Sequence, residues 1–89
     1  MGSKIKIVVL HRGWVAVGIY ERDGVDVTVT GRVVRRWGTS RGLAELASKG
    51  PLEDTRLEDI GVMRHHVLSE ITVFDCNDER WREALEMAS

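Results

Sequence analysis

The sequence predicts an α+β domain, in which a small antiparallel sheet of about five strands is combined with two short helices in the order β-β-β-α-β-β-α. Three observations support this class. Alternating apolar residues and a hairpin-type turn fill the first third of the chain. Two later segments have apolar residues at helical spacing. Strands do not alternate regularly with helices, as a parallel sheet would require. At 89 residues, the chain is expected to form a single domain, 1–89.

Three strands are predicted before the first helix. The first covers residues 4–12 and has apolar residues on both faces, so we expect it inside the sheet. The second covers residues 14–22. The third begins at Val25, after a hairpin turn at residues 23–24. Gly31 within the third strand is expected to mark a β-bulge.

The remaining elements follow a strand-to-helix turn. A short helix is predicted with Thr39 or Ser40 as its N-cap and Gly50 as its C-terminal cap. The polar, acidic residues 52–60 predict a loop. Strands are then expected over residues 61–68 and 70–76, and Asn77 is expected to open the last helix. The apolar face of that helix comprises Trp81, Ala84, Leu85 and Ala88.

The charge of the chain is divided between its halves. The formal net charge is −1, but residues 1–44 carry +5 and residues 45–89 carry −6. No acidic residue lies between Asp26 and Glu45, an interval that contains four arginines. A local positive potential is therefore expected in this interval. Arginine suits bidentate contact with carboxylate or phosphate.

Composition excludes several classes of protein. No apolar run is long enough to span a membrane and no secretory signal pattern is present, so we expect a cytoplasmic protein without a membrane partner. The single cysteine, Cys76, excludes an intrachain disulfide framework. A pI near 6.3 disfavours a dedicated nucleic-acid binder. Because so short a chain buries little surface, we expect a homo-oligomer, a dimer or higher.

The segment between the third strand and the first helix is the main candidate site. A helix start offers free N–H groups to an anion, glycines allow close approach, arginines bind phosphate and tryptophan stacks on a base. These properties together predict a site for an anionic nucleotide-type molecule. Its expected ligand-binding residues are Arg35, Arg36, Trp37, Gly38, Thr39, Ser40, Arg41 and Gly42, with Trp14 as a second stacking surface.

A purely structural role for the same segment is the alternative. Thr39 or Ser40 would then cap the helix and Trp37 would belong to the core. The arginines would form ion pairs with the acidic residues Glu53, Asp54, Glu58 and Asp59.

Catalytic and metal sites have little support in the sequence. His65 and His66 are adjacent and would point to opposite faces of a strand, so they could bind one metal with Asp75 and Cys76 only if the fold collected them. No spacing supports a pairing of His11 with Cys76, and no carboxylates are paired in an apolar context. We therefore expect no enzyme activity, no cofactor and no metal.

A family of small proteins of tailed phages and prophages has a similar pattern. The similar residues are Val34-Arg35-Arg36-Trp37-Gly38-Thr39, then Gly42-Leu43, Gly50-Pro51, Thr55 and Gly61, together with the opening run Val8-Val9-Leu10-His11-Arg12-Gly13-Trp14. Most of residues 5–76 take part, and the RRWGT segment is the most distinctive. The chain resembles anti-Thoeris proteins of the nucleotide-sponge type. That resemblance implies an oligomer that sequesters cyclic ADP-ribose isomers or cyclic oligonucleotides, without degrading them, in the cytoplasm of an infected or lysogenic bacterial host.

Three functions follow as hypotheses. The first is a non-enzymatic phage protein that sequesters an anionic nucleotide signal and so counters host defence. The second is a phage structural or protein-interaction module without a small-molecule ligand. The third is a nucleic-acid binder, whose affinity would fall steeply as salt rises.

Overall fold

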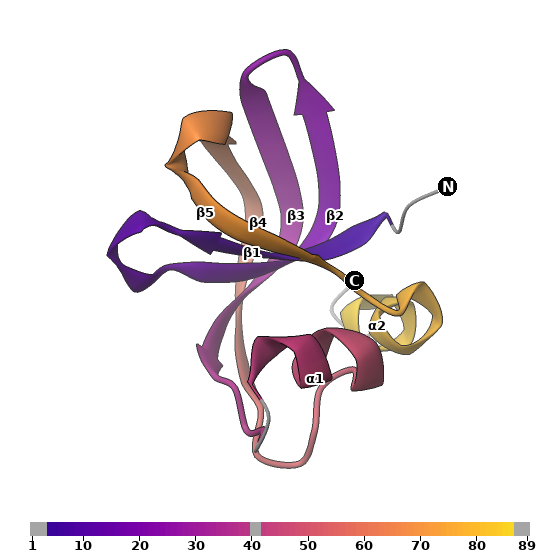
Figure 1. The fold of residues 1–89 in the computed structure, drawn as a ribbon. Coiled ribbons are helices and arrows are strands. Elements are labelled where there is room, and N and C mark those ends of the chain that lie inside the picture. Colours follow the sequence, from indigo (N-terminus) through magenta and orange to yellow (C-terminus); the bar gives the residue numbers. More distant parts are fainter. Residues whose placement is uncertain (1–3, 40–41, 87–89) are drawn as a thin grey trace.

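The computed structural model describes residues 4–39 and 42–86. Its elements follow the predicted order β-β-β-α-β-β-α, which confirms the α+β class (Figure 1). The strands are β1 (Ile5–Leu10), β2 (Val15–Asp23), β3 (Asp26–Arg36), β4 (Arg56–His66) and β5 (Glu70–Asp75). The α-helices are α1 (Leu43–Lys49) and α2 (Asp78–Glu86), and short 3-10 turns cover His11–Gly13 and Val67–Ser69.

The five strands form one antiparallel sheet in the order β4-β3-β2-β1-β5. The first strand, β1, lies inside the sheet between β2 and β5, as its apolar faces predicted. The β2–β3 hairpin turns through Gly24 and Val25, one residue later than the predicted turn at residues 23–24, because Asp23 pairs with Asp26. Gly24 has φ +64, which suits a two-residue turn with glycine in its first central position.

Glycines bend the sheet across three strands. Gly18 of β2 pairs with Gly31 of β3, and Gly31 pairs with Gly61 of β4. A Cβ atom at Gly18 would lie 2.2 Å from the carbonyl oxygen of Thr30, so the backbones approach too closely there for any side chain. The pairing of β3 with β4 shifts directly after Gly31, which confirms an irregularity at the predicted place. The extra residue, Ile60, belongs to β4.

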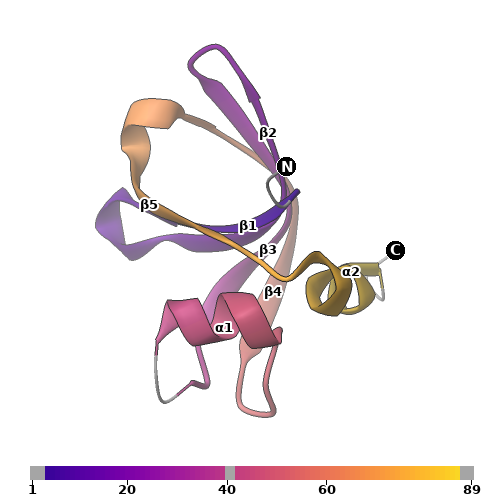
Figure 2. The ribbon, with the colours of Figure 1, turned by 45° about the vertical axis from the view of Figure 1, so that its right-hand side comes forward.

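The two helices cover one face of the sheet and lie on the same side of the strands (Figures 1 and 2). Trp81 of α2 is fully buried, and its indole Nε1 donates to the carbonyl oxygens of Leu46 and Ala47 at 3.1 and 3.2 Å. The helix begins after Asn77 as predicted, with Asn77 Oδ1 accepting from the backbone N–H of Arg80. The cluster on this face comprises Ile5, Ile7, Val15, Val17, Val34, Leu43, Leu46, Ala47, Cys76 and Trp81.

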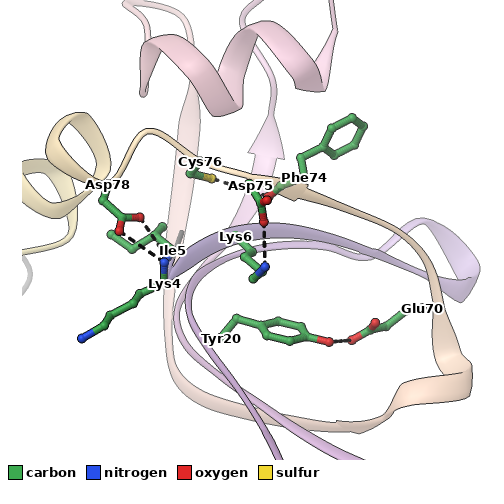
Figure 3. Close-up of polar contacts among 9 residues, drawn as sticks. All are labelled: Lys4, Ile5, Lys6, Tyr20, Glu70, Phe74, Asp75, Cys76 and Asp78. Carbon is green, nitrogen blue, oxygen red and sulfur yellow. Dashed lines mark hydrogen bonds and ion pairs between the residues drawn. The ribbon is translucent and has the colours of Figure 1, made fainter. Parts of the chain in front are cut away.

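The opposite face is buried by the curl of the sheet itself. Its cluster comprises Val8, Leu10, Ala16, Val27 and Val29. Polar groups join the two ends of the curl: Glu70 Oε2 lies 2.8 Å from both His65 Nε2 and the Tyr20 hydroxyl. Figure 3 shows Tyr20 and Glu70 pointing toward one another. The short turn between β4 and β5 lies beside these contacts, so the sheet approaches a closed barrel.

The predicted loop before the fourth strand and the predicted helix cap were wrong. Residues 52–60 were expected to be a loop, but β4 begins at Arg56. It is an edge strand with charged, exposed residues, so it lacks the alternating pattern of a half-buried strand. The N-cap of α1 is Gly42 rather than Thr39 or Ser40, and no side chain caps the helix.

Ser40, Arg41 and Ala88 lie outside the described residues. Within the part of the chain that the structure describes, no helix is long and apolar enough to cross a membrane.

Candidate functional site

Trp14 and Arg35 form the core of the candidate site. Ala16 of β2 pairs with Val33 of β3. Trp14 lies two residues before Ala16, and Arg35 lies two residues after Val33. Both side chains therefore lie on the face of the sheet that Ala16 and Val33 share. The Arg35 guanidinium carbon lies 5.9 Å from the centroid of the Trp14 ring, within the range of a cation–π contact. The structure thus brings together two of the residues predicted for the site.

A second bulge places Arg35 outside the regular ladder. Val34 pairs with Leu57 and Arg36 pairs with Arg56, which leaves Arg35 as the extra residue on β3. Such an irregularity re-aims a side chain at the edge of a sheet. Arg36 is exposed, and the structure places it beside Arg56 rather than beside Trp14.

An acidic residue of β4 engages Arg35. Arg35 Nε donates to Glu58 Oε2 at 2.7 Å, and the two side chains are 53% and 55% exposed. The hydrogen bond and the opposite charge lower the pKa of Glu58 and raise that of Arg35. The pairing of an arginine with Glu58 was the structural alternative for this segment. Because both partners are exposed to water, the ion pair contributes little free energy and a competing anion can replace it.

A pocket of about 210 Å³ opens beside the Trp14 and Arg35 side chains. Besides these two, its walls include Arg12 and Gly13 of the 3-10 turn before β2. Arg12 has φ +67, a backbone conformation that few residues other than glycine adopt. The sequence did not single out Arg12 as a site residue. Its position next to Gly13-Trp14 in a tight turn was the only available indication.

The remaining residues of the segment hold the loop together. The Thr55 hydroxyl donates to the carbonyl of Trp37 at 2.7 Å, and the Thr39 hydroxyl donates to the carbonyl of Gly42 at 3.0 Å. Gly38 has φ +67, and a Cβ atom there would lie 2.4 Å from the backbone nitrogen of Thr55. These contacts explain Gly38, Thr39 and Thr55 by local structure.

The start of α1 offers little to an anion. The helix has seven residues, and Glu45 in its first turn places negative charge beside its N–H groups. Gly42 is its N-cap with φ +83. Trp37 is 43% exposed rather than part of the core. Its ring is therefore available to a ligand, whereas the predicted phosphate cradle at the helix start has little support in the geometry.

The other polar groups form separate clusters. His65 is half-buried against Glu70, whereas His66 is exposed and accepts a hydrogen bond from the backbone N–H of Leu68. Burial, with the nearby Asp78 carboxylate, raises the pKa of the Cys76 thiol to about 12, which makes the thiol a poor nucleophile. Among residues 4–39 and 42–86, no group of three or more His, Cys, Asp and Glu side chains could hold a metal ion.

Comparisons with known proteins found no similar protein. No protein family, curated protein or solved structure matches the chain.

Proposed function

We propose that the protein binds an anionic nucleotide-type molecule on the face formed by Trp14 and Arg35, and that it holds this molecule without converting it. The observation that carries the proposal is the Arg35 guanidinium over the Trp14 ring, 5.9 Å from its centroid. A positive group and an aromatic surface side by side match the two halves of a nucleotide, its phosphate and its base.

The pocket volume fits part of such a ligand. About 210 Å³ accommodates a phosphate group or one base but not a whole dinucleotide. The rest of the molecule would lie along the surface, where Trp37 and Arg36 are exposed. Arg12 would provide a second positive charge at the pocket wall.

On this proposal the Glu58 carboxylate competes with the ligand for Arg35. A ligand phosphate takes the place of Glu58 on Arg35, so one exposed ion pair is exchanged for another. The phosphate also contacts the second arginine and the base stacks on tryptophan, and these additional contacts provide the net free energy of binding.

The resemblance to anti-Thoeris nucleotide sponges supplies the ligand class. On that basis the ligand is a cyclic ADP-ribose isomer or a cyclic oligonucleotide, and its sequestration counters the defence of a bacterial host. The inert thiol of Cys76 and the structural partners of His65 agree with binding rather than catalysis.

A depletion experiment tests the proposal. The protein is incubated with each cyclic ADP-ribose isomer and each cyclic oligonucleotide, and the free nucleotide is measured before and after the protein is denatured. We expect one class to disappear from solution and to return intact on denaturation. A converted product would identify an enzyme, and no depletion of any nucleotide would refute the proposal.

Matched variants then locate the site. Arg35→Gln and Trp14→Leu are each expected to weaken binding by about tenfold or more, because each removes one of the two recognition groups. Arg64→Gln serves as the control, since Arg64 is an exposed arginine on β4 beside the β2–β3 hairpin. Equal affinity of Arg35→Gln and Arg64→Gln would remove Arg35 from the site.

A protein-interaction module is the second candidate. Leu68 and Ile71 are 80% and 60% exposed on either side of Glu70. Exposed apolar side chains this near in sequence are a candidate protein contact surface. Leu68→Ser with Ile71→Ser would abolish binding to a partner protein and leave nucleotide depletion unchanged.

A further inference from the structure

A second pocket lies between α2 and the helix-covered face of the sheet. Its volume is about 410 Å³, within the range of small-molecule sites. Ile5, Ile19 and Leu85 give it apolar walls. Gly31 and Gly61, which pair across β3 and β4, also line it, so the peptide backbone is accessible to a flat molecule there.

The charged groups around this pocket are mostly positive. Lys4, Arg32 and Arg82 line it, against a single acid, Asp59. They come from the residue before β1, the middle of β3 and the middle of α2, so the fold collects charges that are far apart in the sequence. The low polarity of the walls strengthens the attraction of these cations for an anion.

Arg32 holds an unsatisfied hydrogen-bond donor at this pocket. Its Nε is buried and has no hydrogen-bond partner among the residues that the structure describes. Asp59 faces Arg32 across the β3–β4 ladder, but no ion pair joins them within the described chain, and Asp59 Oδ1 accepts instead from the backbone N–H of Gly61 at 3.4 Å. A buried donor without a partner is costly, so this side chain has hydrogen-bonding capacity that the described residues do not use.

We propose that this pocket binds an oxyanion with an apolar body, either a carboxylate or a phosphate monoester. The oxyanion accepts from the guanidinium group of Arg32, which lines the pocket, and the apolar body lies against Ile19 and Leu85. Arg82 and Lys4 add positive charge at the rim. This pocket is separate from the proposed nucleotide site, because Arg32 pairs with Val17 on the helix-covered face whereas Trp14 and Arg35 lie on the other face.

Four probes separate the contributions to binding. Isothermal titration calorimetry on the intact protein compares 1-naphthoate, 1-naphthyl phosphate, the neutral 1-naphthalenemethanol and inorganic phosphate. We expect at least one of the two naphthyl anions to bind at one per chain, about tenfold or more tighter than both the neutral alcohol and inorganic phosphate. The ratio between the two anions identifies which oxyanion the pocket prefers. Equal binding of the alcohol and the anions would overturn the proposal.

Three variants and a control test the role of Arg32. Arg32→Met is expected to weaken binding of the preferred anion by about tenfold or more, and Arg32→Lys to weaken it to an intermediate degree, because lysine keeps the charge but lacks the paired donors. Asp59→Asn is expected to tighten binding a few-fold by removing the nearby negative charge. Arg64→Met leaves binding unchanged.

The opposite directions of these effects make the test decisive. If Arg32 only neutralises Asp59, Arg32→Lys and Asp59→Asn will both leave anion binding at the wild-type level, and the proposal is refuted. If Arg32→Met does not fold, Arg32→Lys and Asp59→Asn still give the two opposite shifts. Trp14→Leu is expected to leave this binding intact, which distinguishes a failure here from a failure of the nucleotide site.

Discussion

Nε of Arg35 lies 2.7 Å from Oε2 of Glu58, in an ion pair whose two side chains are both about half exposed. Glu58 therefore occupies the guanidinium group of Arg35, which the proposed nucleotide site needs for the phosphate. Glu58→Gln is therefore expected to tighten nucleotide binding a few-fold, because it removes a competing carboxylate and leaves the shape of the side chain. The measurement is the dissociation constant at low and physiological salt.

Asp54→Asn is the matched control for this substitution. Asp54 is an exposed acid in the loop before β4 and forms no ion pair within the described residues. Its replacement changes net charge equally and is expected to have a smaller effect. Weaker nucleotide binding by Glu58→Gln would mean that Arg35 needs Glu58 to hold it in position.

Trp81 connects the two helices to each other and to the sheet. It is fully buried, and its Nε1 donates to two carbonyl oxygens at the end of α1. Trp81→Ala is expected to lower the free energy of unfolding by about 3–5 kcal/mol, and Trp81→Phe by about 1–2 kcal/mol because the carbonyls lose their donor. Urea unfolding provides the measurement. Trp37→Phe, on an exposed side chain, should change it by less than about 0.5 kcal/mol.

The glycine row is expected to be essential to the curl of the sheet. Gly18→Ala would place a Cβ atom 2.2 Å from the Thr30 carbonyl oxygen, so we expect a loss of about 3 kcal/mol or more. A Cβ atom at Gly24 would meet no atom within 4 Å, and the only cost of Gly24→Ala is the unfavourable φ of +64. We therefore expect the free energy of unfolding to fall by about 1 kcal/mol. Thermal or urea unfolding of the two variants tests which one loses more stability. A larger loss of unfolding free energy in Gly24→Ala than in Gly18→Ala would contradict the prediction.

Stability is expected to fall at alkaline pH. Burial raises the pKa of Cys76 from 9.0 to about 12. Burial together with the hydrogen bond to Glu70 raises that of Tyr20 from 10.0 to about 12. A raised pKa contributes stability that is complete below the unfolded value and is lost as pH rises through the folded value. The free energy of unfolding should therefore decrease between about pH 9 and pH 12.

The variant Cys76→Ala with Tyr20→Phe isolates this effect. It lacks both ionisable groups, so the slope of its unfolding free energy against pH over the same interval should be smaller than that of the wild type. An unchanged slope would assign the alkaline loss to other groups.

Much of the fold could be predicted from the sequence, because the relevant patterns are local. The apolar residues of β1 to β3 alternate because one face or both faces of each strand are buried. For α2, Asn77 indicates the N-cap and Trp81 belongs to the buried face of the helix. The beginning of β4 could not be predicted, since Arg56, Glu58 and Asp59 are polar residues on an edge strand. Their place in the sheet depends on pairing with β3.

The candidate site was predictable only in part. Residue types identified Arg35 and Trp14, but their contact depends on the β2–β3 register and on a bulge at Arg35 that no local pattern indicates. The segment around Gly38 and Thr39 looked like a phosphate cradle because loop closure and anion binding use the same residue types. In the sequence Arg32 is only one of the four arginines between Asp26 and Glu45, since its buried Nε is a property of the folded chain.

The indole N–H signals of the three tryptophans report directly on whether a nucleotide binds at Trp14. In a ¹H–¹⁵N spectrum of the protein titrated with the nucleotide that it depletes, we expect the Trp14 indole signal to shift in proportion to the bound fraction. The signal of Trp81, buried and bonded to α1, should stay in place. Saturable binding with an unmoved Trp14 signal would contradict the account.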